Sequence, residues 1–231
     1  MGVLGAAWMM PEHLEQELKW IDDHIDGLPY GVDMVFSATS TTIDFKESPR
    51  EIVPEENRRF INKLLDEDGV PALPDDEAKE WYADYARNLA FSPEASEALL
   101  EVALRHPIKL VVSALGMAPQ AVIDKVQGLG IRFGAMIGNA KQARKQAEAG
   151  VDLIIARGSE GGGHTGVVSS LVLWPDIIEA VAPVPVLAAG GIGRGRQMAA
   201  AMALGADGVW CGTIWLGTTE SELSPDMREV L

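Results

Sequence analysis

A single histidine stands inside the glycine-rich segment Arg157-Gly-Ser-Glu-Gly-Gly-Gly-His-Thr-Gly166. Glycines let the backbone approach a ligand closely and adopt positive φ angles, so such a loop can carry a reactive side chain beside a bound molecule. His164 in this loop is reachable by solvent and can act as a base near neutral pH. The alternative is a flexible turn with an incidental histidine. Glu160 lies close by, but a zinc site needs more ligands than this neighbourhood offers, so no metal site is predicted.

Two further apolar runs end in glycines. One places Gly190 and Gly191 just before a helical pattern, and the other ends in Gly212 and Thr213. Backbone N–H groups at such a turn, together with a helix N-terminus, form a site for an anion. Each turn alone is also consistent with a plain tight turn, and Arg196 breaks the dinucleotide-binding spacing. Taken with the histidine loop on the preceding strand, the two turns predict a phosphorylated cofactor with a base beside it.

These segments follow predicted strands in a chain that alternates short apolar runs with helical patterns. Such alternation is typical of βα units and a parallel sheet. About seven strands are predicted, within residues 2–7, 30–36, 108–115, 132–138, 151–157, 185–189 and 209–216. Because barrels of βα units carry their sites on the loops after the strands, we expect an α/β fold of the TIM-type (β/α)8 class.

Residues 37–107 interrupt this alternation. They are polar, acidic and punctuated by proline, with helical pieces predicted near 55–67, 76–90 and 94–105. This range is too long for an ordinary connection between a strand and a helix. We interpret 37–107 as a helical insertion within one domain that spans 1–231. Because it leaves the face where the strands end, we expect it to cover the site as a lid.

Composition excludes several classes of function. The 231 residues include 19 Lys and Arg against 34 Asp and Glu, and the net charge is −15. That charge disfavours nucleic acid and anionic membrane surfaces as partners. The sequence has neither an apolar run of about 18 residues nor the features of a secretory signal at its start. The single cysteine, Cys211, excludes an internal disulfide and fits a cytoplasmic protein.

The three glycine segments resemble those of the nitronate monooxygenase family, formerly called 2-nitropropane dioxygenases. Gly158-Ser-Glu-Gly-Gly-Gly-His-Thr-Gly166 is similar to the family's Gly-x-Glu-Ala-Gly-Gly-His-x-Gly. Two segments of this chain resemble the family's FMN phosphate loops. They are Ala188-Ala-Gly-Gly-Ile192 and Leu204-Gly-Ala-Asp-Gly-Val209 with Gly212-Thr213. Three further segments resemble the family's second, third and fourth strands. In that order they are Gly2-Val-Leu-Gly5, Tyr30-Gly-Val-Asp33 and Val112-Ser-Ala-Leu-Gly116. The likeness spans almost the whole chain.

The resemblance implies an FMN-dependent oxidoreductase. The FMN phosphate would be held by the backbones of Gly190, Gly191, Gly212 and Thr213, and the flavin would be approached by Gly158, Gly162 and Gly163. His164 would act as the general base or orient the substrate. The implied reaction oxidises an alkyl nitronate with O2 to a carbonyl compound and nitrite, and the flavin supplies the redox chemistry.

The chain also departs from the family pattern. The family's first strand, with its Gln-Ala-Pro-Met-like segment, and its C-terminal helices have no counterpart. We therefore expect an open strand edge in a chain that is marginally stable, forms a homodimer or binds flavin weakly. Asp33 stands where many members have Asn, and Arg157 stands where a Gln usually faces the flavin. Arg157 would either stabilise the reduced anionic flavin or pair with an acid such as Asp152 or Glu160. Pairing of Arg157 with an acid is the favoured interpretation.

Two other functions remain open. An FMN-dependent enoyl-thioester reductase shares the Glu-x-Gly-Gly-His loop and would require NAD(P)H. A non-catalytic barrel fragment would bind a phosphorylated ligand or nothing. NAD(P)H oxidation stimulated by an enoyl thioester would favour the reductase, and a colourless protein that takes up no FMN would favour the fragment.

Overall fold

The computed structural model describes residues 1–36, 53–71, 93–163 and 166–229. Its strands are β1 (Gly2–Gly5), β2 (Tyr30–Val35), β3 (Leu110–Leu115), β4 (Arg132–Ile137), β5 (Leu153–Arg157), β6 (Val186–Ala189) and β7 (Gly208–Trp210). Its helices are α1 (Pro11–His24), α3 (Glu55–Glu67), α5 (Pro93–Ala103), α6 (Gln120–Gly128), α7 (Ala140–Glu148), α8 (Ser170–Val181), α9 (Gly195–Ala203), α10 (Thr213–Leu216) and α11 (Pro225–Glu229). Within these ranges, no helix has both the length and the apolar character needed to span a membrane.

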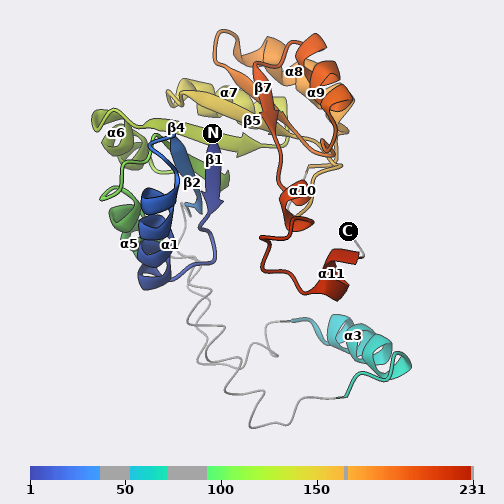
Figure 1. Cartoon of the computed structure of the whole chain (residues 1–231). Helices are drawn as coiled ribbons and strands as arrows, with labels where there is room; N and C mark the ends of the chain where they lie inside the picture. Colours follow the sequence, from blue (N-terminus) through green and yellow to red (C-terminus); the bar gives the residue numbers. More distant parts are fainter. Residues whose placement is uncertain (37–52, 72–92, 164–165, 230–231) are drawn as a thin grey trace.

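The described strands form one parallel sheet in the order β1-β2-β3-β4-β5-β6-β7, so each strand pairs with its neighbours along the chain. The sheet is curled, and helices lie on its outer side (Figure 1). Helices connect successive strands along most of the sheet. This arrangement is that of a TIM-type barrel and confirms the predicted fold class. In the described ranges β1 and β7 each pair with a single strand, so both edges of the sheet are open.

Alternate residues of each strand point to opposite faces of the sheet. The outward face packs under the helices and holds most of the core, including Val111, Phe133 and Ile154. The inward face carries a smaller buried cluster made of Leu110, Val112, Met136, Ile155 and Ala189. By the same alternation, Asp33 and Arg157 fall on the inward side, near the carboxyl ends of β2 and β5.

The last described piece of the range 37–107 is part of the barrel's own helical layer. Helix α5 packs against α1 and β2, between the two strands that it connects. Ser96 Oγ donates a hydrogen bond to the carbonyl oxygen of Val35 at 2.9 Å, and Leu99 and Leu100 are buried. The helix predicted near 94–105 is therefore the crossover between β2 and β3. The piece predicted near 76–90 lies outside the described residues.

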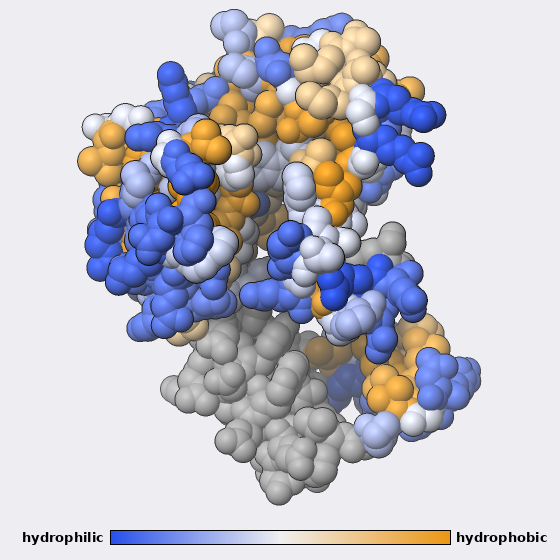
Figure 2. All heavy atoms as spheres, in the orientation of Figure 1, coloured by the Kyte–Doolittle hydropathy of each residue, from blue (hydrophilic) through white to orange (hydrophobic). Residues whose placement is uncertain are grey.

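Helix α3 coincides with the helix predicted near 55–67, but none of its residues is buried. Its large apolar side chains are exposed, and these are Phe60, Ile61, Leu64 and Leu65. Figure 2 shows apolar atoms at the surface of this helix. In Figure 1, α3 lies beyond the end of the sheet toward which β1 points. That is the side on which a lid would have to lie.

Strand β7 is shorter than the strand predicted over 209–216. Its last pair joins Trp210 to Ala189, the final residue of β6, so the chain beyond has no ladder partner. Thr213 begins α10 instead. The apolar pattern of residues 209–216 does not distinguish a strand from a short helix. The strand ends at Trp210 because β6, its neighbour in the sheet, ends at Ala189.

Candidate functional site

The loops that follow β5, β6 and β7 lie side by side at the carboxyl ends of the strands. Gly158 N donates a hydrogen bond to Ala189 O at 3.0 Å, which joins the first loop to the end of β6. A Cβ atom placed on Gly162 would lie 3.1 Å from Thr213 Oγ1, so the first loop also reaches the third. The fold thus brings together three segments that the sequence pattern marked separately.

The turn after β6 requires glycine at two successive positions. The φ angles of Gly190 and Gly191 are +107° and +72°, in a region that other residues rarely adopt. A Cβ atom on Gly190 would lie 2.8 Å from Ser170 Oγ, and one on Gly191 would lie 3.0 Å from Glu160 Cβ. Gly212 differs, because its φ is −112° and no described atom lies within 4 Å of its Cβ position. The turn after β6 therefore depends on bare backbone, whereas the turn after β7 does not.

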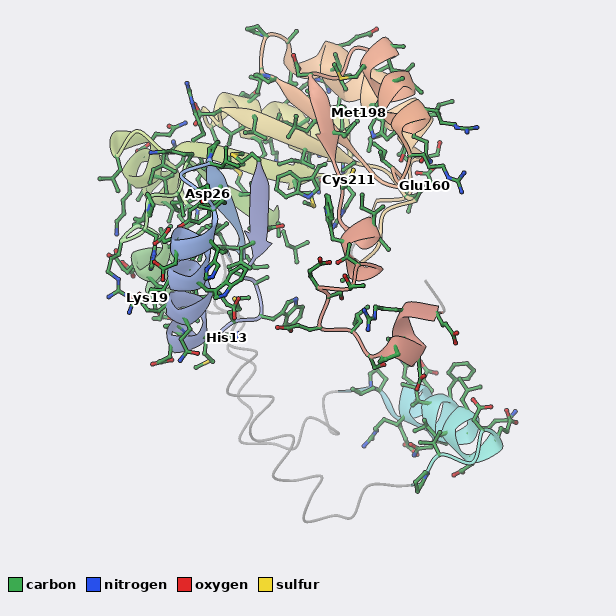
Figure 3. The ribbon with its side chains drawn as sticks, viewed as in Figure 1. His13, Lys19, Asp26, Glu160, Met198 and Cys211 are labelled. Carbon is green, nitrogen blue, oxygen red and sulfur yellow. The ribbon has the colours of Figure 1, made fainter. Side chains whose placement is uncertain are left out.

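Glu160 fixes the histidine loop to the start of α8. Its carboxylate accepts hydrogen bonds from Ser170 Oγ at 2.6 Å and from Ser170 N at 2.8 Å. These two bonds, the one from the hydroxyl first, lower the pKa of Glu160. Figure 3 labels Glu160 on the loop between β5 and α8. This positioning role could not be predicted from the sequence, because Ser170 precedes any clear helical pattern.

The charge that acts on Arg157 comes from Asp33 of β2. Of the two partners expected from the sequence, Asp152 pairs with Arg132 at 2.7 Å, and Glu160 is held by α8 as described above. The structure therefore replaces both expected partners with Asp33. Positions 33 and 157 are brought within range only because both face the inside of a curled sheet.

Asp33 is an acid in a largely apolar setting. Its Oδ1 atom is buried and has no hydrogen-bond partner among the described residues. Burial raises the pKa of Asp33 to about 7, and the positive charge of Arg157 offsets only part of that effect. Burial also lowers the pKa of Arg157, against the influence of Asp33. Near neutral pH, Asp33 can hold or release a proton at the inner face of the barrel.

His164, the predicted catalytic residue, lies with Thr165 outside the described residues. The structure does describe both of its flanks. Gly163 has a φ of +73°, and a Cβ atom on Gly166 would lie 2.8 Å from Gly138 O, at the end of β4. The segment therefore starts and ends beside the site, and the role of His164 stays a prediction.

A cavity of about 460 Å³ lies beside Arg157, at the carboxyl ends of β3, β4 and β5. Its polar lining comes from Asn139, Gln142, Lys145, Gln146 and Arg157. Asn139 Oδ1 accepts a hydrogen bond from Gln142 N at 2.9 Å and so caps the start of α7. Lys145 and Gln146 carried no signal in the sequence, because only the packing of α7 directs them toward this cavity.

The three glycine loops fit the phosphate group of a cofactor. In the described part of the chain, Gly191 N and Gly212 N donate no hydrogen bond to other backbone groups. Unpaired N–H groups beside a turn and a helix start attract an anion. No three His, Cys, Asp or Glu side chains of the described residues gather as a metal site.

Comparison with known proteins identifies the family. The family model for nitronate monooxygenase matches residues 1–230. The chain belongs to the nitronate monooxygenase family. A Mycobacterium tuberculosis protein named as a monooxygenase, Rv1533, is 46% identical over 233 residues, which cover 99% of this chain and 61% of that protein. This chain therefore spans less than two thirds of the length of the Mycobacterium tuberculosis relative.

Two further relatives show different chemistry within similar chains. The solved structure of a nitroalkane oxidase from Streptomyces ansochromogenes is 25% identical with a TM-score of 0.73, over 98% of this chain and 61% of that one. A Rhodococcus jostii protein is named as a (3aS,4S,5R,7aS)-5-hydroxy-7a-methyl-1-oxo-octahydro-1H-indene-4-carboxyl-CoA dehydrogenase. It is 43% identical over 130 residues, 56% of this chain and 36% of its own length. The first comparison supports the barrel fold, and the name of the second protein gives a carboxyl-CoA as the compound on which that protein acts.

Proposed function

We propose that this chain binds FMN and oxidises alkyl nitronates with O2 to a carbonyl compound and nitrite. The observation that carries the proposal is the meeting of three glycine loops at the ends of β5, β6 and β7, in a chain of the nitronate monooxygenase family. Loops after the last strands of a barrel commonly bind phosphate. The N–H groups of Gly191 and Gly212, which have no backbone partner among the described residues, suit that role.

The residues expected to hold FMN divide between its two ends. The backbones of Gly190, Gly191, Gly212 and Thr213 hold the phosphate, and those of Gly158, Gly162 and Gly163 pass close to the ring. Arg157, on the inner side of β5, would lie on the side of the sheet that faces the ring. Its positive charge stabilises negative charge that develops beside it. When bound, FMN supplies the redox chemistry that these side chains lack.

His164 acts in this proposal as the general base or orients the nitronate. The support is its place in a loop that Glu160 ties to α8 and that returns to the end of β4 at Gly166. We expect His164→Ala to lower kcat/KM for a nitronate by about 100-fold or more while FMN affinity stays within about threefold. His24→Ala, on the outer helix α1, is the matched control.

Three further features belong to the proposal. The part of 37–107 that precedes α5 covers the flavin as a lid, which the exposed apolar side chains of α3 beyond the strand ends support. The protein works in the cytoplasm on a small nitronate and O2. It pairs as a homodimer through its open sheet edges. Sedimentation of the full chain across a range of concentrations tests the dimer, and a monomer throughout would remove it.

FMN titration is the decisive test of the main proposal. We expect saturable binding, measured by quenching of flavin fluorescence, that Gly191→Ala weakens at least about tenfold. The reason is the φ of +72° and the 3.0 Å approach to Glu160 Cβ at that position. Gly128→Ala is the control, because nothing described lies within 4 Å of its Cβ position. Equal binding by both variants, or no binding by the wild type, would refute the flavin site.

A second candidate function is oxidation or reduction of an acyl thioester beside its carbonyl group. The specific observation in its favour is the 43% identity to the Rhodococcus jostii carboxyl-CoA dehydrogenase. The enoyl-thioester reductase considered from the sequence performs the related reduction with NAD(P)H. Under this alternative, Asp33 or His164 exchanges the proton next to the thioester carbonyl, since the pKa of Asp33 is about 7.

The two candidates are separated by their substrates. The FMN-loaded chain is assayed with an alkyl nitronate and O2, and separately with a saturated or an enoyl CoA thioester. The assay with the saturated thioester includes an electron acceptor, and the assay with the enoyl thioester includes NAD(P)H. Nitrite release from the nitronate, without turnover of either thioester, supports the first candidate. Turnover of a thioester alone supports the second.

A further inference from the structure

The cavity beside Arg157 occupies a different part of the barrel mouth from the glycine turns after β6 and β7. Its lining comes from the ends of β3, β4 and β5, from α7 and from Gly166 at the end of the histidine loop, whereas the other two glycine turns follow β6 and β7. Arg157, at the end of β5, lines the cavity and pairs with Ala189, just before the turn after β6. A ligand in this cavity can therefore lie next to a flavin whose phosphate is held at the other side.

The cavity carries positive charge in an acidic protein. Lys145 and Arg157 line it, and its lining includes no Asp or Glu. Lys145 forms no ion pair within the described ranges. Helix α7 also carries Lys141 and Arg144 against a single acid, Glu148, although the chain as a whole has a net charge of −15. Lys141 and Lys145 stand four residues apart and so share one side of the helix. The rim of the cavity therefore favours an anionic group.

One residue that lines the cavity has an unmet hydrogen-bond acceptor. Gln146 is only 4% exposed, and it lines the cavity. Its Nε2 atom donates to Gly116 O at 3.3 Å, but its Oε1 atom is buried with no partner in the described structure. A buried acceptor left unpaired is costly, so it points to a donor that a ligand brings. That ligand has an N–H or O–H group inside the cavity and an anion at the rim.

We propose that this cavity binds the arm of an acyl thioester that carries an amide and a phosphate, as in coenzyme A. The thioester end lies by Arg157, the amide N–H donates to Gln146 Oε1, and the phosphate lies against Lys145 and Lys141 on the exposed side of α7. Ammonium groups bind phosphate through charge-assisted hydrogen bonds. The inference rests on the thioester candidate of the proposed function, and it names the subsite that would recognise such a substrate.

The test titrates the full FMN-loaded chain with coenzyme A and follows the heat of binding. We expect Lys145→Gln to weaken binding about tenfold or more, and Lys145→Arg to retain most of the affinity. Lys109→Gln is the matched control, because it removes the same charge just before β3, at the opposite end of that strand. Affinity of the wild type should fall as salt is raised.

Two further probes separate the parts of the ligand. Pantetheine, which has the amides but no phosphate, should bind more weakly and be insensitive to Lys145→Gln. Gln146→Leu should weaken pantetheine and coenzyme A to a similar extent. Inorganic phosphate alone should bind far more weakly than coenzyme A, because it reaches only the rim.

Several results would overturn the inference. These are absence of coenzyme A binding, equal losses in Lys145→Gln and Lys109→Gln, and inorganic phosphate binding as tightly as coenzyme A. A large loss of FMN affinity in Lys145→Gln would assign the cavity to the flavin itself and also overturn it. Failure to bind FMN would refute the flavin proposal separately, since coenzyme A binding can be measured without it.

Discussion

Asp33 of β2 and Arg157 of β5 lie on the inner face of the curled sheet, and each shifts the pKa of the other. The Oδ1 atom of Asp33 still lacks a hydrogen-bond partner among the described residues, so the interaction is one of charge rather than of full pairing. The resemblance to nitronate monooxygenases implied two neutral amides, Asn and Gln, at these positions. The two departures are therefore complementary, since an acid and a base together replace two neutral amides.

Asp33→Asn should change how stability depends on pH. The folded pKa of Asp33 is about 7. The ordinary pKa of an aspartate is about 4, so the unfolded chain releases this proton at a lower pH than the folded chain does. The wild type therefore loses stability as pH rises from about 4 to about 7, and loses little more above that. We expect the free energy of unfolding of Asp33→Asn, relative to wild type, to rise across this window by about 2–4 kcal/mol. Urea unfolding at several pH values measures it. A difference that is constant with pH would mean that Asp33 titrates normally.

Asp152→Asn should show the opposite dependence and so serves as the matched control. Burial alone raises the pKa of Asp152, but hydrogen bonds from Phe133 N at 2.8 Å, from Gln127 and from Arg132 outweigh it and lower the pKa. The resulting stability is present above the ordinary pKa and is lost as pH falls through the folded one. We expect Asp152→Asn to be about 1–2 kcal/mol less stable at neutral pH, with the loss shrinking below about pH 4. A loss that persists in acid would indicate packing rather than charge.

Ser170→Ala should loosen the histidine loop. It removes the hydroxyl that donates to Glu160 at 2.6 Å and leaves the bond from Ser170 N. We expect a stability loss of about 1–2 kcal/mol and a rise in the pKa of Glu160 toward its ordinary range. Thermal unfolding and carboxyl NMR shifts measure the two effects. Ser169→Ala is the control, because the side chain of Ser169 makes no capping hydrogen bond. Equal losses in both variants would remove the special role of Ser170.

Gly31→Ala should disrupt the sheet between β2 and β3. A Cβ atom at this position would lie 2.6 Å from Leu110 O and 2.8 Å from Leu110 Cβ, which is closer than backbone packing allows. Gly31 pairs directly with Leu110 in the parallel register, so the strands would have to move apart. We expect a loss of about 2–4 kcal/mol in the free energy of unfolding. Gly2→Ala has no described neighbour within 4 Å of its Cβ position and should change stability by less than about 1 kcal/mol. Chemical denaturation of both variants compares them, and equal stability would contradict the close approach.

Local chemistry in the sequence determined most of the elements. Asn139 caps α7 through Gln142 N, and Gly150, with a φ of +82°, follows its end. The glycine turn after β6 was also visible, since Gly190 and Gly191 can adopt angles that other residues avoid. These features depend on contacts within a few residues, so side-chain type and spacing predict them. The alternation of strands and helices gave the barrel class for the same reason.

Only the tertiary structure decided which distant residues meet. It gave Arg157 the partner Asp33 instead of Asp152 or Glu160, and it turned Lys145 and Gln146 toward one cavity. The end of β7 was likewise set by the length of β6 and not by its own apolar run. The physical reason is that the curl and register of the sheet set these contacts. Both arise from packing over the whole barrel, which no short stretch of sequence encodes.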